Sequence, residues 1–499
     1  MIKSILIANR GEIAIRIART AKRMGIKTYG IRTKKEPNAV YLSKVDEVVD
    51  FPETDGKVAE FLDIPNLVKL AVDNHIDSMH PGYGYLSENA DFAQACQDNG
   101  VIFVGPSPKI IRDMGDKIIA KEIAMRAGVP MLGGTKGGVA TAEAAIEQAN
   151  SMGYPVIIKA ASGGGGRGMR ICWKEDEVAR NWKLCTDEAT TAFNDPTVFI
   201  EKYLQNPKHI EFQIVADKYG NVVHLGEREC SIQRKHQKLM EEAPSPALTE
   251  EMREKMATAA VNLAKEAGYE SLGTVEFLLD AQGNFYFMEM NTRIQVEHPV
   301  TEMITGLNLV ELQLLIASGE KLPVEQKDIK LNGWAIECRI NAEDVQGGFT
   351  PSIGLIRNLR LPSDNNIRID SGVRVGTEIT PFFDSMIAKL IVHGKDRNDA
   401  IDLSLRSLQH FSVMGVKTTI PFCKQVLHNE IFRKGDFNTS FIDKVLGDNL
   451  IYKEPHEDLI AALLAVSTYN HDNDFIGDGE DTPEAGMDPW VLQKRIRHL

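Results

Sequence analysis

The chain has 499 residues, with 57 lysines and arginines against 70 aspartates and glutamates, and a net charge of −13 at neutral pH. This length is more than one hydrophobic core usually serves, so we expect two to four domains. The acidic balance argues against a nucleic-acid binder, and no apolar run approaches the length of a membrane span. We recognise no signal or transit segment, and the six cysteines contain no CxxC pair, so we expect a cytoplasmic protein with reduced thiols.

The N-terminal residues predict a strand at 2–8, a helix at 12–24 and a second strand at 28–31. This βαβ order is typical of a parallel sheet with covered faces. The turn after the first strand lacks GxGxxG, which disfavours a nicotinamide dinucleotide. A second glycine-rich turn, HPGYGYLSE at 80–88, precedes a helix that Ser87 could cap. Loops of this kind gather at the carboxyl edge of such a sheet, where ligands bind.

A glycine loop lies between two predicted strands, at 155–160 and 169–172. The first strand carries Lys159 near its end, and the loop contains the four consecutive glycines Gly163, Gly164, Gly165 and Gly166. Consecutive glycines let backbone N–H groups approach an anion closely, and the lysine adds a point charge for phosphate. We therefore predict a phosphate-covering hairpin loop rather than a flexible linker, although GxxxxGK[ST] is absent and the loop is not of the Walker A type.

Polar side chains occur in the next two predicted strands, at 198–204 and 209–213. Glu201 and Lys202 end the first of them and could give an adenine one acceptor and one donor beside apolar walls. A charged strand end in solvent would look the same, so both interpretations stay open. In the second strand His209, Glu211 and Gln213 alternate, which places them on one face.

A basic, amide-rich run covers residues 230–238, between a predicted strand at 222–225 and the acidic pair Glu241-Glu242. A basic loop is usually solvated, but its place between strands makes an anion site at least as good an interpretation. Cys230 begins the run and could be reactive in such a loop, but we favour a structural thiol.

Two further strands, at 274–279 and 284–288, are joined by a short glycine-containing turn and predict a hairpin. If residues 282–283 form a two-residue turn, Glu276 lies directly opposite Glu289. Like charges in such a pair are unfavourable unless a divalent cation bridges them. A slip of one residue in the register would place the two glutamates on opposite faces.

The polar pattern continues beyond the hairpin. Glu289, Asn291, Arg293, Gln295 and Glu297 occupy every second position, which in an extended strand places all five on one face. Because the preceding run is apolar, we predict a functional surface rather than a solvated edge strand. Carboxylates joined by one amide suit Mg²⁺ or Mn²⁺.

A new region begins near residue 334, and residues 334–446 predict a mixed, largely antiparallel domain with a helix at 396–411. Residues 455–469 could form one amphipathic helix. Residues 470–489 carry seven acidic residues and no lysine or arginine, as in an extended linker. The chain then closes on a basic and apolar segment suited to docking.

Together these motifs resemble the biotin carboxylase family, ATP-grasp enzymes that form the first half of the biotin-dependent carboxylases. The match runs in family order over roughly residues 1–447. It is carried by ANRGEIAIRI (8–17), HPGYGYLSEN (80–89), MGDK (114–117), KAASGGGGRGMR (159–170), ERECSIQRKHQK (227–238), EMNTRIQVEHPVTE (289–302) and ECRINAED (337–344). An inserted alanine, Ala161, and the basic segment 32–36 depart from the family pattern and touch no expected catalytic position.

The resemblance implies an α/β and α+β fold class in three domains and a tail. We expect a Rossmann-like parallel-sheet (pre-ATP-grasp) domain at 1–114, an ATP-grasp domain at 115–331 and a mixed antiparallel C-terminal domain at 332–447, followed by a helix, an acidic linker and a docking segment at 448–499. A mobile lid, at about 131–203, would close over the triphosphate and exclude water, because the reaction intermediate hydrolyses easily.

The resemblance also implies a reaction: ATP phosphorylates bicarbonate to carboxyphosphate, which carboxylates N1′ of biotin on a carrier protein. Glu297 would be the general base, Lys238 would stabilise the transferring phosphoryl group, and Arg339 would stabilise the ureido oxygen of biotin. The implied nucleotide-binding residues are Lys117, Lys159, Gly163, Gly164, Gly165, Gly166, Glu201, Lys202, Leu204, His209, Gln233, His236, Glu276 and Glu289. The implied ligands of Mg²⁺ or Mn²⁺ are Glu276, Glu289 and Asn291, those of bicarbonate are Lys238, Arg293 (also catalytic), Gln295 and Val296, and those of biotin are Tyr83 and Arg339.

The biotin-attachment signature, a lysine between two methionines, is absent from the sequence. We therefore expect the biotin carrier and the carboxyltransferase to be separate chains, and the family is commonly homodimeric. The final acceptor (acetyl-CoA, propionyl-CoA or pyruvate) stays open. An ATP-grasp ligase of the carbamoyl-phosphate synthetase kind shares some segments, but this chain is too short for duplicated halves. A non-catalytic scaffold would predict loss of Glu297, Lys238 or Arg339, and all three are present.

Overall fold

The computed structural model describes residues 1–447 except 55, 57, 136 and 162–167, and beyond them only residues 462 and 466. Contacts divide the chain into two units, residues 1–451 and 452–499. The predicted phosphate-binding glycines Gly163–Gly166 lie outside the described residues, as does almost all of the predicted tail at 448–499.

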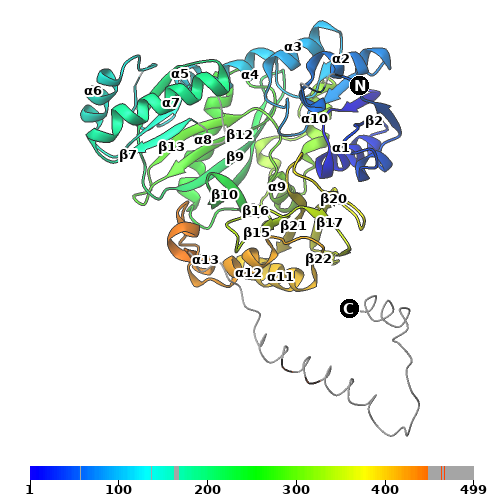
Figure 1. Ribbon diagram of the computed structural model, residues 1–499. Coiled ribbons are helices and arrows are strands. Elements are labelled where there is room, and N and C mark those ends of the chain that lie inside the picture. Colours follow the sequence, from blue (N-terminus) through cyan, green and yellow to red (C-terminus); the bar gives the residue numbers. More distant parts are fainter. Residues whose placement is uncertain are drawn as a thin grey trace, which may run out of the picture. The chain divides into compact units, whose positions relative to one another are not determined.

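A five-stranded parallel sheet forms the N-terminal part of the molecule (Figure 1), in the order β3-β2-β1-β4-β5. Its strands are β1 (Ser4–Ile7), β2 (Lys27–Arg32), β3 (Glu47–Asp50), β4 (Ser78–His80) and β5 (Ile102–Phe103), with helices α1 (Gly11–Arg23), α2 (Ile64–Asp73), α3 (Ala90–Asp98) and α4 (Pro108–Gly115). The predicted strand–helix–strand start and parallel sheet are confirmed. The predicted helix cap at Ser87 is wrong: Asn89 caps α3 by accepting a hydrogen bond from the Phe92 amide at 2.8 Å.

An eight-stranded antiparallel sheet lies at the centre of the fold, in the order β13-β12-β9-β10-β11-β14-β21-β19. Its strands are β9 (Lys208–Ala216), β10 (Val222–Arg234), β11 (Gln237–Ala243), β12 (Ser271–Leu279), β13 (Phe285–Asn291), β14 (Trp334–Asn341), β19 (Ile367–Ser371) and β21 (Met386–Gly394). Helices α8 (Glu250–Glu266), α9 (His298–Thr305), α10 (Leu309–Ala317) and α11 (Arg397–His410) pack on it. Because β11 pairs with β14, one sheet continues from the predicted ATP-grasp region into the predicted C-terminal domain.

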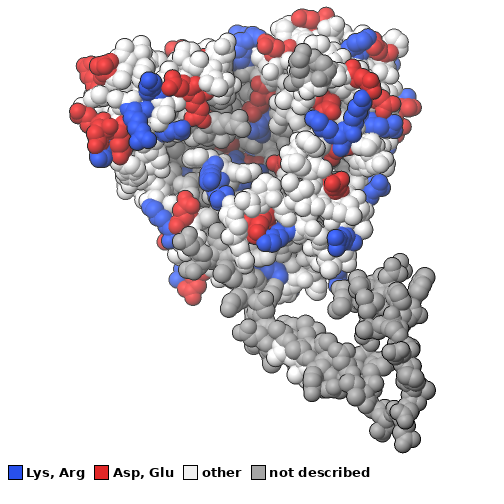
Figure 2. Space-filling view, in the orientation of Figure 1, with Lys and Arg blue, Asp and Glu red and all other residues white. Residues whose placement is uncertain are grey.

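A smaller three-stranded sheet, β7-β6-β8, forms the predicted lid region together with two helices (Figure 1). Its elements are α6 (Ala142–Met152), β6 (Val156–Ala160), β7 (Met169–Cys172), α7 (Val178–Phe193) and β8 (Val198–Lys202), and α5 (Lys117–Arg126) precedes them. The surface is hollowed between this region and the N-terminal sheet, and both acidic and basic side chains are visible in the hollow (Figure 2).

The remaining elements lie in the C-terminal region: β15 (Glu343–Asp344), β16 (Thr350–Pro351), β17 (Gly354–Leu355), β18 (Asn358–Arg360), β20 (Glu378–Ile379), β22 (Ser412–Met414), α12 (Ile420–His428) and α13 (Glu430–Lys434). All of the strand pairs among them are antiparallel, as predicted for this region. Within the described residues, no single helix has the length and hydropathy needed to cross a membrane, although the bent pair α9 and α10 passes on length and composition.

The predicted β12–β13 hairpin is confirmed, and Glu276 does pair with Glu289. The predicted two-residue turn is wrong, since Asp280 and Asn284 close a longer loop in which the Asp280 carboxylate accepts from the Gln282 and Asn284 amides. Pairing beside the loop is therefore one residue out of the predicted register. A β-bulge between Glu276 and Phe277 restores it, which brings the two glutamates opposite each other.

The predicted extension of this strand to Glu297 is wrong. β13 ends at Asn291, and the Thr292 amide donates to Glu88 Oε1 at 3.2 Å instead of continuing the ladder with β12. Arg293 and Gln295 lie in the loop that follows, and Glu297 is the N-cap residue of α9. The basic run at 230–238 is likewise a hairpin rather than a loop, because β10 continues to Arg234 and β11 begins at Gln237.

Candidate active site

Glu276, on β12, is the point where most of the predicted site residues meet. Its carboxylate accepts hydrogen bonds from Asn291 Nδ2 at 2.7 Å, Gln295 Nε2 at 3.0 Å and Lys238 Nζ at 3.0 Å. His209 Nε2 lies 2.8 Å from its other oxygen. Burial alone would raise the pKa of Glu276, but Lys238 and His209 outweigh burial and hold it below its usual range. The carboxylate is therefore ionised, as a cation ligand must be.

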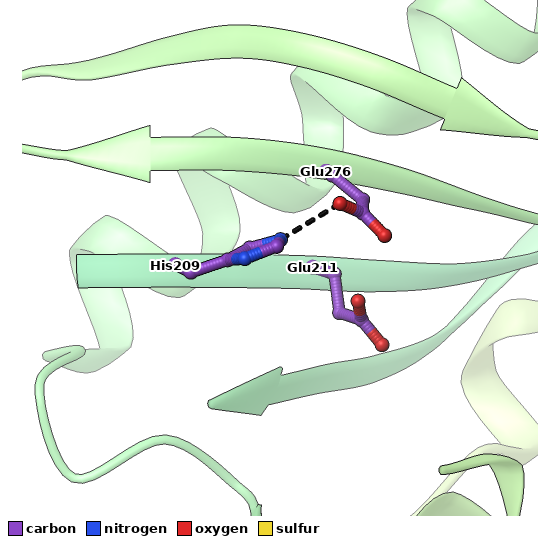
Figure 3. A group of neighbouring side chains, drawn as sticks. All are labelled: His209, Glu211 and Glu276. Atoms are coloured by element: carbon purple, nitrogen blue, oxygen red, sulfur yellow. Dashed lines mark hydrogen bonds and ion pairs between the residues drawn. The ribbon is translucent and has the colours of Figure 1, made fainter. Parts of the chain in front are cut away.

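His209 and Glu211 come from β9 and Glu276 from the neighbouring strand, and Figure 3 shows the three side chains close together. Their ligand atoms lie within 4.8 Å of one another, which is close enough to share a metal ion. However, Glu211 is already paired with Arg228 and Lys238, and His209 with Glu276. We interpret this group as the support that orients Lys238 and Glu276.

Lys238 is placed by the hairpin between β10 and β11. The two turn residues, Lys235 and His236, have φ values of 49° and 65°, the left-handed conformation that a tight hairpin turn requires. Lys238 Nζ then donates to Glu297 Oε1 at 2.6 Å, in addition to the contacts with Glu211 and Glu276. Burial would lower the pKa of Lys238, but the three glutamates outweigh it and raise the pKa well above its usual value. The ammonium is a fixed positive charge at the centre of the site.

Glu297 lies between two cations. Besides the contact with Lys238, its Oε2 accepts a hydrogen bond from Arg339 Nη2 at 2.9 Å. Arg339, on β14, also forms an ion pair with Glu241 on β11. Burial would raise the pKa of Glu297, but Lys238, Arg339 and Arg228 hold it well below its usual range. The predicted base is thus brought directly against the predicted biotin-side arginine.

The loop after β13 keeps Arg293 and Gln295 together although they are not in a strand. Arg293 Nη1 donates to Gln295 Oε1 at 2.8 Å, and Nη2 donates to Asn291 Oδ1 at 3.0 Å. Arg293 Nε donates to Glu88 Oε2 at 2.7 Å, which ties the loop to the glycine-rich turn at 80–88. The side chains predicted to bind bicarbonate therefore converge through hydrogen bonds rather than through strand alternation.

Two predicted phosphate ligands, Lys117 and Lys159, lie at β6. Lys159 Nζ lies 2.6 Å from Glu201 Oε2, and Lys117 Nζ donates to the Ala160 carbonyl at 3.1 Å. Burial would raise the pKa of Glu201, but Lys159 and Lys121 outweigh it and lower the pKa to about 2. Burial lowers the pKa of Lys117. Both predicted lysines thus lie at the end of β6. The sequence interpretation missed Lys121, one helical turn after Lys117.

The other residues predicted around the nucleotide are more dispersed. Lys202 Nζ donates to the carbonyls of Gly153 and Tyr154 at 3.1 and 3.0 Å, so its contacts lie within the predicted lid region. Leu204 is half-buried between β8 and β9, Gln233 is buried on β10, and His236 is exposed in the turn before β11.

The predicted metal ligands fit a hard cation. Glu276 and Glu289 pair across the hairpin, and burial together with Glu276 and Glu88 raises the pKa of Glu289. Two facing carboxylates are the arrangement that a divalent cation relieves. Asn291 Oδ1 already accepts from Arg293, so the two carboxylates are the primary candidate ligands and the amide is secondary.

Tyr83, which is predicted to bind biotin together with Arg339, donates its hydroxyl hydrogen to Glu12 Oε1, and Lys389 binds the same oxygen at 2.9 Å. The sequence interpretation missed Glu12 and Lys389. Lys389 is the one lysine in the nine-residue, otherwise mainly apolar strand β21, and that isolated charge was a signal.

Comparisons with known proteins identify the family of the chain. Residues 1–111 match the family described as biotin carboxylase, N-terminal domain; residues 116–325 match the carbamoyl-phosphate synthase L chain, ATP binding domain; and residues 337–444 match the biotin carboxylase C-terminal domain. A pyruvate carboxylase subunit of Methanothermobacter thermautotrophicus is 50% identical over 447 residues, covering 89% of this chain and 90% of its own. Biotin carboxylase 1 of Bacillus subtilis is 48% identical over 444 residues, covering 89% and 98%.

Among solved structures, the biotin carboxylase domain dimer of Hydrogenobacter thermophilus 2-oxoglutarate carboxylase, in complex with MgADP, ADP and bicarbonate, superposes with a TM-score of 0.88. It is 47% identical, and the match covers 91% of this chain and all of that one. These relatives are similar over nearly the whole described fold, including the sheet that carries Lys238 and Arg339 and the helix α9 that Glu297 precedes. The chain therefore belongs to the biotin carboxylase family of ATP-dependent ligases.

Proposed function

We propose that this chain is the biotin carboxylase subunit of a multi-subunit biotin-dependent carboxylase. ATP would phosphorylate bicarbonate to carboxyphosphate, which would carboxylate N1′ of biotin on a separate carrier protein and leave ADP and phosphate. The observation that carries the proposal is the position of Glu297, which contacts Lys238 on one side and Arg339 on the other. One carboxylate would thus act between a cation on the phosphoryl side, Lys238, and a cation on the biotin side, Arg339.

In the first half-reaction, Glu297 would take the proton of bicarbonate, and a bicarbonate oxygen would attack the γ-phosphorus of ATP. A carboxylate with so low a pKa is a weak base. Anionic substrates near Lys238 and Arg339 would compete for these cations, which would raise the pKa of Glu297 when it has to act. Lys238 would then stabilise the charge that develops on the transferring phosphoryl group.

In the second half-reaction, N1′ of biotin would attack the carboxyl carbon as the carbon–oxygen bond of carboxyphosphate breaks. The phosphate released would accept the N1′ proton. Arg339 would stabilise the charge on the ureido oxygen, in the manner of an oxyanion hole, with Tyr83 beside it. Arg293, Gln295 and the Val296 backbone would hold the bicarbonate in place.

The nucleotide would bind in the hollow beside the lid, with its phosphates near Lys117, Lys159 and the loop at 163–166 and its base near Glu201 and Leu204. Mg²⁺ or Mn²⁺ would be held by Glu276 and Glu289 with Asn291, and would neutralise charge on the phosphates. Support comes from the fit of these carboxylates and from the relative whose structure contains MgADP and bicarbonate.

The assembly is proposed by analogy with the relatives. The relative from Hydrogenobacter thermophilus is described as a dimer, and we propose a cytoplasmic homodimer that meets a carrier chain and a carboxyltransferase chain. Relatives are subunits of pyruvate carboxylase and 2-oxoglutarate carboxylase, so 2-oxoglutarate joins acetyl-CoA, propionyl-CoA and pyruvate as a candidate acceptor.

The test follows ATP cleavage by the purified chain with and without bicarbonate and free biotin. We expect cleavage that requires bicarbonate and increases with biotin. A bicarbonate-dependent rate that ignores biotin would instead favour a ligase with another acceptor, of the carbamoyl-phosphate type. Cleavage independent of bicarbonate would refute both.

A further inference from the structure

Lys389 is a fully buried lysine, with 0% of its side chain exposed. It lies on β21, directly opposite Arg339 on β14 and Asp370 on β19. Residues paired in this way present their side chains on the same face of the sheet. Lys389 therefore stands beside the proposed biotin-side arginine, on a sheet against which α9 packs.

The Lys389 ammonium joins two segments that are far apart in the sequence. Nζ donates to the Val296 carbonyl at 2.9 Å and to Glu12 Oε1 at 2.9 Å, with Asp370 Oδ2 at 4.0 Å. Burial would lower the pKa of Lys389, but Glu12, Glu337 and Asp370 outweigh burial and raise it. A charged ammonium is retained in the interior only when partners such as these compensate its lost hydration.

The contact with Val296 fixes one of the two peptide groups that flank this residue. The other is fixed by His298, whose amide and Nδ1 both bind the Gln295 carbonyl, at 3.3 and 2.8 Å. Because a carbonyl only accepts, Nδ1 carries the hydrogen. The Val296 N–H belongs to the peptide group that His298 holds, and Lys389 holds the peptide group on the other side of Val296. The residue is therefore fixed at both ends, as a backbone donor to bicarbonate needs.

The contact with Glu12 leads to the biotin side. Glu12 lies in the first turn of α1, and its Oε1 also accepts from the Tyr83 hydroxyl. The backbone after β19 packs directly on this turn, since a Cβ on Gly372 would lie 2.7 Å from the Glu12 amide nitrogen. Hydrogen bonds therefore run without a break from Val296 through Lys389 and Glu12 to Tyr83.

We propose that Lys389, together with Glu12, is a positioning residue that holds the bicarbonate-binding backbone at Val296 and the tyrosine of the biotin side in one fixed relation. It touches no substrate and acts through these groups. The inference rests on the proposed function. It adds that binding of bicarbonate and binding of biotin share one buried support, which binding of ATP does not use.

Lys389→Met tests the proposal because methionine keeps the length of the side chain and removes the charge and the donors. We expect the KM for bicarbonate and the KM for free biotin each to rise roughly tenfold, the effect of one lost charge-assisted hydrogen bond, while the KM for ATP stays within about twofold. Glu12→Gln leaves Lys389 to hold Val296, so we expect the KM for biotin to rise more than that for bicarbonate. The matched control is Arg397→Met, which removes a half-buried cation, 12% exposed, that is paired with Glu242 in another network; it should change thermal stability without changing these KM values.

A Lys389→Met protein that is less stable but has all three KM values unchanged would show a purely structural role and overturn the inference. If Lys389→Met does not fold, Glu12→Gln decides, and an unchanged KM for biotin overturns it. The proposed function fails separately, at the wild-type protein, if ATP cleavage there does not depend on bicarbonate and biotin.

Discussion

Replacing Glu297 by glutamine removes the proposed base with almost no change in shape. The side chain is buried and lies 2.6 Å from Lys238 Nζ and 2.9 Å from Arg339 Nη2. Loss of a positioned general base lowers a rate by about 10²–10⁴-fold. That factor corresponds to roughly 3–5 kcal/mol of transition-state stabilisation. We therefore expect kcat to fall by this amount at saturating bicarbonate and biotin.

The same substitution should leave the fold and nucleotide binding nearly intact. Lys238 keeps Glu211 and Glu276, and Arg339 keeps Glu241, so the cations stay paired. Weakening of the two charge-assisted hydrogen bonds should cost no more than about 3 kcal/mol of stability. The proposed phosphate lysines bind other groups, so the Kd for ATP should stay within about threefold.

The assay measures ADP release together with the Kd for ATP, and Glu302→Gln is its matched control. Glu302 is also a buried glutamate of the α9 region between two cations, Arg16 at 2.6 Å and Arg368 at 2.6 Å. Its replacement should reduce stability and leave the rate within about threefold of wild type. A Glu297→Gln rate within about tenfold of wild type would refute the general-base assignment.

Buried charges give three further predictions. Burial raises the pKa of Glu229 from 4.5 to about 7, so the native state binds the proton more tightly than the unfolded state does. The free energy of unfolding should therefore fall by up to about 3 kcal/mol as pH rises from about 4.5 to about 7. Glu229→Gln should reduce this fall, measured by urea titrations at pH 5 and 8, and an unchanged fall would contradict the prediction. Glu289→Gln should raise the magnesium concentration for half-maximal activity by roughly tenfold or more, since tenfold requires only about 1.4 kcal/mol, whereas an unchanged requirement would remove Glu289 from the metal site. Arg228→Met should lower the free energy of unfolding by about 3–5 kcal/mol, because Arg228 is fully buried and its removal takes one of two cationic partners from Glu211. A decrease of less than about 1 kcal/mol would contradict this prediction.

Local pattern predicted much of the fold. The N-terminal strand–helix–strand unit, the β12–β13 hairpin and the pairing of Glu276 with Glu289 could be predicted because apolar periodicity and turn residues act over short distances. The Glu276–Glu289 pairing was predicted from an incorrect turn. It is nevertheless present, because the longer loop shifts the register by one residue and the bulge shifts it back. Bulges depend on packing and leave little trace in one sequence.

The features that were missed depend on contacts between distant residues. β13 ends at Asn291 because Thr292 binds Glu88, more than two hundred residues earlier, and no alternation of polar residues contains that information. The sequence shows Lys389 as a single lysine in a mainly apolar strand, but it does not show the contacts with Glu12 and Val296 on which the proposed role of Lys389 depends. The proposed roles of Glu297, Lys238 and Arg339 came from the family resemblance. The geometry adds that Glu297 contacts both Lys238 and Arg339.

The central claim is that bicarbonate, activated at Glu297, attacks ATP. The most direct test supplies bicarbonate labelled with ¹⁸O and measures the label in the phosphate released. If a bicarbonate oxygen attacks the γ-phosphorus and the carbon–oxygen bond of carboxyphosphate later breaks, each phosphate carries one oxygen from bicarbonate. Phosphate without the label would mean that water is the nucleophile, which would contradict the account.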